Sequence, residues 1–171
     1  MGKTLKNPSI VRVLGIDPGT ATVGWGIVEE RDGKFVPVAF GHISTSQKDS
    51  EESRLMEISS DIVDILKKYR PHEAAVEQLF FFKNQKTIIQ VGQARGAIIL
   101  TLAQKDVSIA SYTPLQVKQS VTGYGKAEKK QVQAMIKNIL KLKSVPKPDD
   151  TADALALAIC HINSRKLNSL K

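Results

Sequence analysis

Four acidic residues of this 171-residue chain have types and positions that could do chemistry, and Asp17 comes first. It ends a run of β-forming residues and is followed at once by Pro18 and Gly19, which cannot continue a strand. A carboxylate at the end of a mostly apolar strand is costly to bury unless a cation meets it. An aspartate that caps the turn explains the same position. Asp17 alone leaves both interpretations open.

The other three acids lie where further elements could bring them to the same place. Glu77 falls in a short apolar segment, 73–78, that predicts a strand. Asp150 and Asp153 are three residues apart at the predicted start of a helix, so they share one face. A negative charge near a helix N-terminus is also favourable in itself, which gives both a possible structural role. The apolar run after Asp153, ALALAIC, predicts that this helix packs on the sheet and brings its acidic end to the strands.

Four carboxylates in one place repel one another unless divalent cations neutralise them. A ligand set made only of oxygen suits Mg²⁺ or Mn²⁺ rather than zinc, and no cluster of Cys and His residues competes. We interpret His161, which follows the apolar run, as a packed or surface residue and not as a ligand. Such an acidic cluster beside a basic surface is what two-metal hydrolysis of a phosphodiester requires.

The elements that must position these acids alternate along the chain. Periodicity and turn residues predict strands at 11–17, 23–28, 34–45, 73–78 and 107–112. Helices are predicted after the cap Ser50 to about 69, and at about 85–104, 114–122, 128–142 and from 150 onward. Gly92 and Gly96 share one helix face, where another backbone could approach closely. The pattern indicates an α/β domain with a mixed five-stranded sheet and helices on both faces.

The charge of the chain is unevenly distributed. The formal net charge is +8 with a pI near 9.6, which suggests a polyanionic partner. Eight lysines against one acid, Glu128, lie in the segment 118–147, whereas the segment 29–64 is rich in acids. A solvated lysine face would give the same pattern, but a run this one-sided favours a surface that faces phosphates.

Length and composition indicate one domain spanning residues 1–171, with 1–10 and 166–171 expected to be flexible ends. We find no signal-peptide pattern in the first residues and no apolar run near the roughly 20 residues of a membrane span. The single cysteine, Cys160, allows no internal disulfide and fits a reducing cytosol.

Five segments of the chain together resemble the RuvC family of Holliday-junction resolvases. They are LGIDPGTATVGWGIV, AAVEQLFFFKN, VGQARGAI, VKQSVTGYGKAEKKQV and PDDTADALALAICH, in this order and at family-like spacing. The resemblance covers nearly the whole chain. It implies a ribonuclease-H-like fold and a homodimer that nicks two opposed strands of a four-way DNA junction, leaving a 5′ phosphate and a 3′ hydroxyl.

The resemblance also assigns roles to residues. Four acids match the acidic positions of the family and would hold two Mg²⁺ ions, or Mn²⁺ in their place: Asp17, Glu77, Asp150 and Asp153. Asp150 is selected over Asp149 by the spacing acid-x-x-Asp-Ala-Leu-Ala. Four further residues match positions associated with DNA contact, namely Phe80, Phe81, Lys118 and Lys129. The implied partners are junction DNA, a second copy of the chain and the branch-migration complex RuvAB, at the nucleoid in the cytoplasm.

Three other functions stay open at this point. A junction-binding protein without catalysis would need the same basic surface, and a nuclease of the same fold could act on ribosomal RNA precursors. Actin-like kinases and ATPases share the Asp-x-Gly-Thr turn seen at Asp17, but they need two related domains, and no second such turn occurs here.

Overall fold

A computed structural model of the chain describes residues 10–79 and 85–169. The strands are β1 (Val11–Asp17), β2 (Thr22–Arg31), β3 (Lys34–Ser44), β4 (Glu73–Glu77) and β5 (Ser108–Tyr112). The helices are α1 (Glu51–Tyr69), α2 (Gln85–Gln104), α3 (Pro114–Thr122), α4 (Lys129–Ile139) and α5 (Asp149–Ser169). The sheet has the order β3-β2-β1-β4-β5, in which the first three strands are antiparallel and β1, β4 and β5 are parallel. The predicted mixed five-stranded sheet is confirmed.

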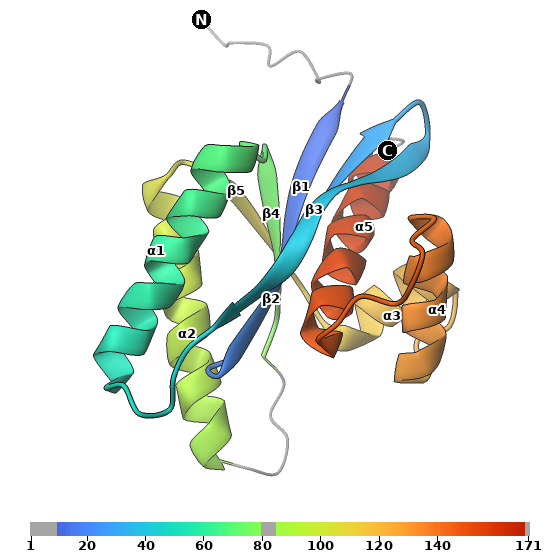
Figure 1. Cartoon of the computed structure of the whole chain (residues 1–171). Helices are drawn as coiled ribbons and strands as arrows, with labels where there is room; N and C mark the ends of the chain where they lie inside the picture. The colour runs from blue at the N-terminus through green and yellow to red at the C-terminus, as the bar shows by residue number, and fades with distance from the viewer. Residues whose placement is uncertain (1–9, 80–84, 170–171) are drawn as a thin grey trace, which may run out of the picture.

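Helices cover both faces of this sheet, as predicted (Figure 1). α1 and α2 lie on one face, and α3, α4 and α5 lie on the other. Successive side chains of a strand point to opposite faces, so each strand feeds two cores. In β1, Val11 and Val13 belong to the core on the α5 face, whereas Leu14 and Ile16 belong to the core under α1 and α2.

Three glycines let α5 lie directly on the strands. A Cβ atom at Gly15 would stand 1.9 Å from the carbonyl oxygen of Ala154, and one at Gly24 would stand 2.0 Å from that of Asp150. At Gly26 it would meet the side chain of Leu155 at 2.7 Å. At Gly15 and Gly24, helix backbone therefore rests on strand backbone, which only glycine permits.

Most predicted element ends agree with the structure, with small corrections. Ser50 and Thr113 cap α1 and α3, and Gly123 ends α3 in the left-handed conformation. α4 is shorter than predicted and ends at Ile139, while α5 extends to Ser169, into the stretch expected to be a flexible end. The close backbone approach expected at Gly92 and Gly96 is not found among the described residues, where a Cβ at Gly96 would meet nothing within 4 Å.

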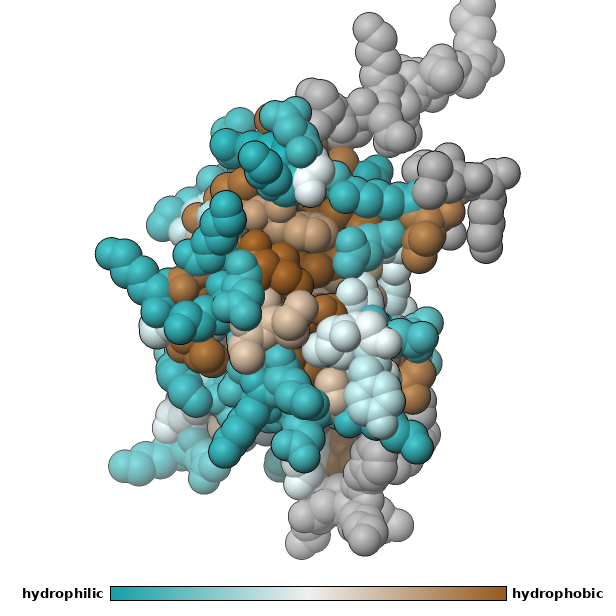
Figure 2. Space-filling model, turned by 90° about the vertical axis from the view of Figure 1, so that its right-hand side faces the viewer, coloured by the Kyte–Doolittle hydropathy of each residue, from teal (hydrophilic) through white to brown (hydrophobic). Residues whose placement is uncertain are grey.

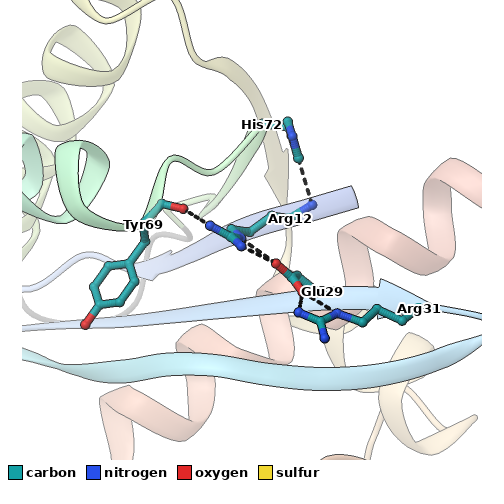
Figure 3. A network of polar contacts seen from close by, with 5 residues as sticks. All are labelled: Arg12, Glu29, Arg31, Tyr69 and His72. Carbon is teal, nitrogen blue, oxygen red and sulfur yellow. Dashed lines mark hydrogen bonds and ion pairs between the residues drawn. The ribbon is translucent and has the colours of Figure 1, made fainter. Parts of the chain in front are cut away.

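An ion-pair network closes the amino-terminal end of β1 (Figure 3). Glu29 of β2 is 1% exposed and accepts hydrogen bonds from Arg12 and Arg31, each through Nε at 2.6 Å. Arg12 also donates to the carbonyl oxygen of Tyr69 at the end of α1, and its backbone N–H donates to Nδ1 of His72. The network therefore ties β1, β2 and the end of α1 together.

Within residues 10–79 and 85–169, no helix is both long enough and apolar enough to cross a lipid bilayer.

Candidate active site

Two carboxylates meet at the carboxyl ends of neighbouring parallel strands. β1 and β4 pair with Ile16 opposite Val76, so Asp17 and Glu77 are the next residues on their strands. Strand alternation sends both side chains to the face that carries α5. Val13, four residues before Asp17, and Ala75, two residues before Glu77, belong to the core on that face. The sequence prediction that strand ends bring these two acids together is confirmed by this register.

The first turn of α5 adds the other two acids. Asp150 lies over Gly24, which is the register partner of Asp17 in β2. Carboxylate oxygens of Asp17, Asp150 and Asp153 lie within 4.8 Å of one another. Glu77 stands beside this group, because its charge acts on Asp17 and the charge of Asp153 acts on it. All four predicted acids are thus brought to one place, and the arrangement offers an all-oxygen site to a hard cation.

Burial and mutual repulsion dominate the electrostatics of the group. Burial, followed by the charges of Glu77, Asp153 and Asp150, raises the pKa of Asp17 from 3.8 to about 9. Burial and the charge of Asp153 also raise the pKa of Glu77, and the pKa of Asp153 is raised chiefly by burial. Without a cation the group therefore holds protons that a bound divalent ion would displace.

Among the residues that the structure describes, Lys129 is the basic side chain that pairs with this group. Its Nζ lies 3.1 Å from Oδ2 of Asp153 and 3.6 Å from Oδ2 of Asp149. Burial lowers the pKa of Lys129, but the charge and hydrogen bond of Asp153 outweigh it and raise the pKa. Lys129 begins α4, so the start of the lysine-rich helix is joined to the acidic start of α5.

Asp149 lies outside the converging group that contains its neighbour Asp150. Its Oδ1 accepts a hydrogen bond from Nζ of Lys147 at 2.7 Å, and its side chain is 41% exposed. It is not one of the three carboxylates that converge within 4.8 Å. The side-chain bond from Lys147 lowers the pKa of Asp149, which is the opposite direction from Asp17.

A cleft of about 200 Å³ opens beside the acids. Acids and lysines line it together with apolar residues, and the full lining is Glu77, Pro114, Val117, Lys118, Lys129, Val132, Asp153 and Ala156. Lys118 and Lys129 thus flank two of the carboxylates. Lysines beside an acidic group can bind the phosphates of a polyanion and so offset the repulsion between those phosphates and the carboxylates.

The lysine-rich segment lies mostly on the surface, on the side of the molecule that carries α3 and α4. Among its lysines six are exposed, at positions 126, 129, 130, 141, 143 and 147. Figure 2 views the molecule from this side and shows hydrophilic side chains around a smaller apolar area. Phe80 and Phe81, predicted to contact DNA, lie outside the residues that the structure describes.

Two sets of contacts near the acids were not anticipated from the sequence. His161 is 8% exposed, and its ring nitrogens bond to the hydroxyl of Tyr112 at 2.7 Å and to Oε2 of Glu73 at 2.5 Å. It is a packed histidine, as interpreted, but one that joins α5 to β4 and β5. Arg95 of α2 donates from Nε to the carbonyl oxygen of Glu77 at 2.8 Å. In the sequence, the alternation of Glu73, Ala75 and Glu77 along β4 was the signal that could have indicated the contact of Glu73 with His161. No sequence pattern indicated the contact of Arg95 with Glu77.

Comparison with known proteins identifies relatives of this chain. A sequence model described as crossover junction endodeoxyribonuclease RuvC matches residues 13–161. Proteins of that name from Fusobacterium nucleatum and Caldicellulosiruptor saccharolyticus are 54% and 52% identical, each over 90% of this chain and over 81% and 93% of their own lengths. The structure of Thermus thermophilus RuvC in complex with a Holliday junction substrate superposes with a TM-score of 0.88 at 33% identity, covering 93% of this chain and 97% of that one.

Proposed function

Because this chain belongs to the RuvC family of crossover junction endodeoxyribonucleases, we propose that it resolves four-way DNA junctions by hydrolysing phosphodiester bonds. The observation that supports this function for the present chain is the cluster of its acids. Carboxylate oxygens of Asp17, Asp150 and Asp153 lie within 4.8 Å of one another, and Glu77 lies beside them. The chain acts in homologous recombination and DNA repair, where such junctions arise. Its products are a 5′ phosphate and a 3′ hydroxyl.

The acids fit a pair of Mg²⁺ ions, which Mn²⁺ can replace. Every ligand atom is a carboxylate oxygen. Burial and then the charges of the neighbouring acids raise the pKa of Asp17 to about 9, and a bound divalent cation would stabilise its ionised form. Asp17 is central to the group, while Glu77, Asp150 and Asp153 complete the ligand set. When bound, such ions supply an activated water and neutralise charge on the leaving oxygen.

The chain's own side chains bind and orient the substrate. Lys118 and Lys129 flank the carboxylates and can hold the phosphates on either side of the scissile bond. Lys129 is paired with Asp153 in the described structure, so it is positioned to exchange that carboxylate for a phosphate oxygen. Phe80 and Phe81 follow Glu77 in sequence, and we propose that their rings stack on unpaired bases at the crossover.

Paired symmetric nicks require two active sites, so the chain acts as a homodimer. α2 carries an apolar stripe suited to this contact, because Ile89 and Leu100 are 64% and 59% exposed and Gly96 between them leaves open space. A homodimer bound to a junction is also the form that would meet the branch-migration complex RuvAB, on nucleoid DNA in the cytoplasm.

The test is cleavage of a synthetic four-way junction, measured beside a duplex of matched sequence. Mg²⁺ or Mn²⁺ should support nicking of the junction and not of the duplex, and Ca²⁺ should support binding with little cleavage. Binding without cleavage under all conditions would favour a non-catalytic junction-binding protein. Processing of a structured ribosomal RNA precursor in preference to the junction would favour the RNA-directed alternative. Robust cleavage in excess chelator would contradict the two-metal proposal.

A further inference from the structure

Glu77 is the last residue of a strand that has little support at its end. β4 is five residues long, and the chain leaves the sheet directly after Glu77. On the β5 side, the backbone N–H of Gln78 donates to the carbonyl oxygen of Tyr112 at 2.8 Å. On the β1 side the ladder cannot continue past Asp17, because Pro18 has no N–H to donate. The carbonyl oxygen of Glu77 needs a donor from elsewhere.

Arg95 of α2 supplies this donor. Its Nε donates to the carbonyl oxygen of Glu77 at 2.8 Å, and its Nη2 donates to Oγ of Ser111 on β5, also at 2.8 Å. The planar guanidinium therefore spans the carboxyl ends of both strands in a fixed geometry. α2 also approaches the chain just beyond β4, since a Cβ at Gly92 would lie 3.6 Å from Cδ1 of Leu79.

The other three acids are held by means that do not extend to Glu77. Asp17 lies inside the ladders of β1, and Asp150 and Asp153 lie on a helix that rests on glycine backbone. Glu77 stands at the edge of this group, where the charge of Asp153 repels its carboxylate. Its direction depends on the backbone that Arg95 fixes.

We propose that Arg95 is a positioning residue for the nuclease reaction: by clamping the Glu77 carbonyl to Ser111, it holds the Glu77 carboxylate toward the metal-binding acids. Arg95 itself touches neither the acids' carboxylates nor the cleft beside them. This role rests on the proposed function, since it concerns the same metal site. It assigns to α2 a part in metal binding.

The test measures metal affinity as well as cleavage in Arg95→Met, which keeps the length of the side chain and removes its donors. Groups that orient metal ligands through hydrogen bonds typically change metal affinity by roughly 10–100-fold when removed. We expect the dissociation constant of Mn²⁺ for the DNA-free protein, and the Mg²⁺ concentration for half-maximal nicking, both to rise by about tenfold or more. Junction affinity in chelator should stay at the wild-type value. Arg95→Lys, which keeps the charge but cannot span both acceptors, should shift both quantities by less.

Thr101→Val is the matched control on the same helix. It removes the 2.7 Å hydrogen bond between Thr101 and Ser59, which joins α2 to α1 away from the acids, and it keeps the side-chain shape. It should lower the melting temperature without moving either metal measurement. The proposal is overturned if Arg95→Met and Arg95→Lys keep wild-type metal affinities, or if Thr101→Val shifts them as much. The Mn²⁺ titration needs no cleavage, so a wild-type protein that failed to cut junctions would count against the proposed function and not against this role.

Discussion

Strand β1 has Arg12 near its beginning and Asp17 at its end, and the charges around these two residues are balanced in different ways. At the first end, the buried carboxylate of Glu29 forms ion pairs with two arginines, Arg12 and Arg31. At the other end, Asp17 lies among three further carboxylates, and Lys129 is the cation that contacts the group. The two sites are joined by the same pair of strands.

The pKa values of the two ends move in opposite directions. Burial alone would raise the pKa of Glu29, but the hydrogen bonds and charges of Arg12 and Arg31 outweigh it and lower the pKa. Burial raises the pKa of Asp17 to about 9, and its acidic neighbours add to the effect. A buried acid whose partners come from the protein stabilises the fold, whereas one that lacks them is left to bind a partner from solution. Charge balance therefore separates the structural end of the strand from the functional end.

The largest expected effect is at the unbalanced end. Asp17→Asn keeps the side-chain shape but removes the central charge of the metal site, so junction cleavage should fall by several orders of magnitude. The melting temperature in chelator should stay the same or rise, because the variant removes a repelled carboxylate. Junction binding should survive. Asp149→Asn is the control, and cleavage should change little because Asp149 pairs with Lys147 outside the converging group. Near wild-type cleavage by Asp17→Asn would place the metal site elsewhere.

Gly15→Ala tests whether the acidic end depends on the approach of α5. The added Cβ would stand 1.9 Å from the Ala154 carbonyl oxygen, so the helix must move away from β1. We expect a loss of about 3 kcal/mol in unfolding free energy, at the upper end for an overpacked core. Nicking should fall further than the folded fraction explains, because Asp150 and Asp153 move with the helix.

The control for this variant is Gly33→Ala, in a turn where a Cβ would meet nothing within 4 Å. Strain from its positive φ of 76° should cost some stability without a specific loss of nicking. If Gly15→Ala melts lower but cuts in proportion to its folded fraction, the approach of α5 does not set the geometry of the acids.

Glu29→Ala tests the balanced end and should affect stability without affecting chemistry. It leaves two arginines without their shared acceptor. We expect a loss of about 2 kcal/mol in denaturant unfolding, less than the roughly 3–5 kcal/mol for a fully buried pair, because Arg12 and Arg31 keep partial access to water. Nicking by the folded protein should match wild type. A specific loss of nicking would show that the two ends of β1 are coupled.

The smallest expected effect is a difference in pH dependence. Glu29 has a lowered pKa when folded, so its stabilisation is present above its usual value of 4.5 and is lost as the pH falls below it. Asp17 has a raised pKa, so the metal-free fold loses stability as the pH rises from about 4 toward 9. Mg²⁺ must displace the proton of Asp17, and its stabilising effect should therefore grow with pH by at most about 1.4 kcal/mol per unit.

Thermal melting at pH 6 and pH 8, with Mg²⁺ and with chelator, measures this difference. The gain in melting temperature from Mg²⁺ should be larger at pH 8, and Asp17→Asn should remove the dependence. Glu29→Gln should leave it unchanged. An equal gain at both pH values would contradict the assignment of a bound proton to Asp17.

The sequence predicted those parts of the fold and site that follow from local patterns. Apolar runs ended by Pro18 and by Pro71 placed the strands and helices, and caps such as Ser50 and Thr113 fixed helix starts to the residue. Strand ends and helix starts were enough to place the four acids together, because parallel strands share one carboxyl edge. Deciding between Asp149 and Asp150 required the family resemblance.

Contacts between residues distant in sequence could not be predicted in this way. The glycines at 15, 24 and 26 lie on two strands and form no single periodic pattern that indicates a helix contact. Gly92 and Gly96 do share one helix face, but in the described part of the chain a Cβ at Gly92 would meet only the side chain of Leu79, and one at Gly96 would meet nothing within 4 Å. Arg95 donates to the backbone carbonyl of Glu77, and this acceptor is present whatever side chains the strand carries. No residue pattern therefore indicates the contact. Lys129 was predicted to contact DNA, but a sequence does not show that its resting partner is Asp153.

The direct contact of α5 with Gly15 and Gly24 also affects how far substitutions elsewhere in the molecule can alter the spacing of the acids. Where side chains separate a helix from a sheet, every rotamer change or substitution between them alters the gap. Here the gap is set by a carbonyl oxygen resting over a glycine Cα atom, and neither of these groups has alternative rotamers. The apolar residues that surround this contact can be exchanged, by mutation or by design, while the helix keeps its height above the strands. The distance from Asp17 to Asp150 is therefore set by a non-bonded contact between two backbones, and it depends little on the packing of the core side chains.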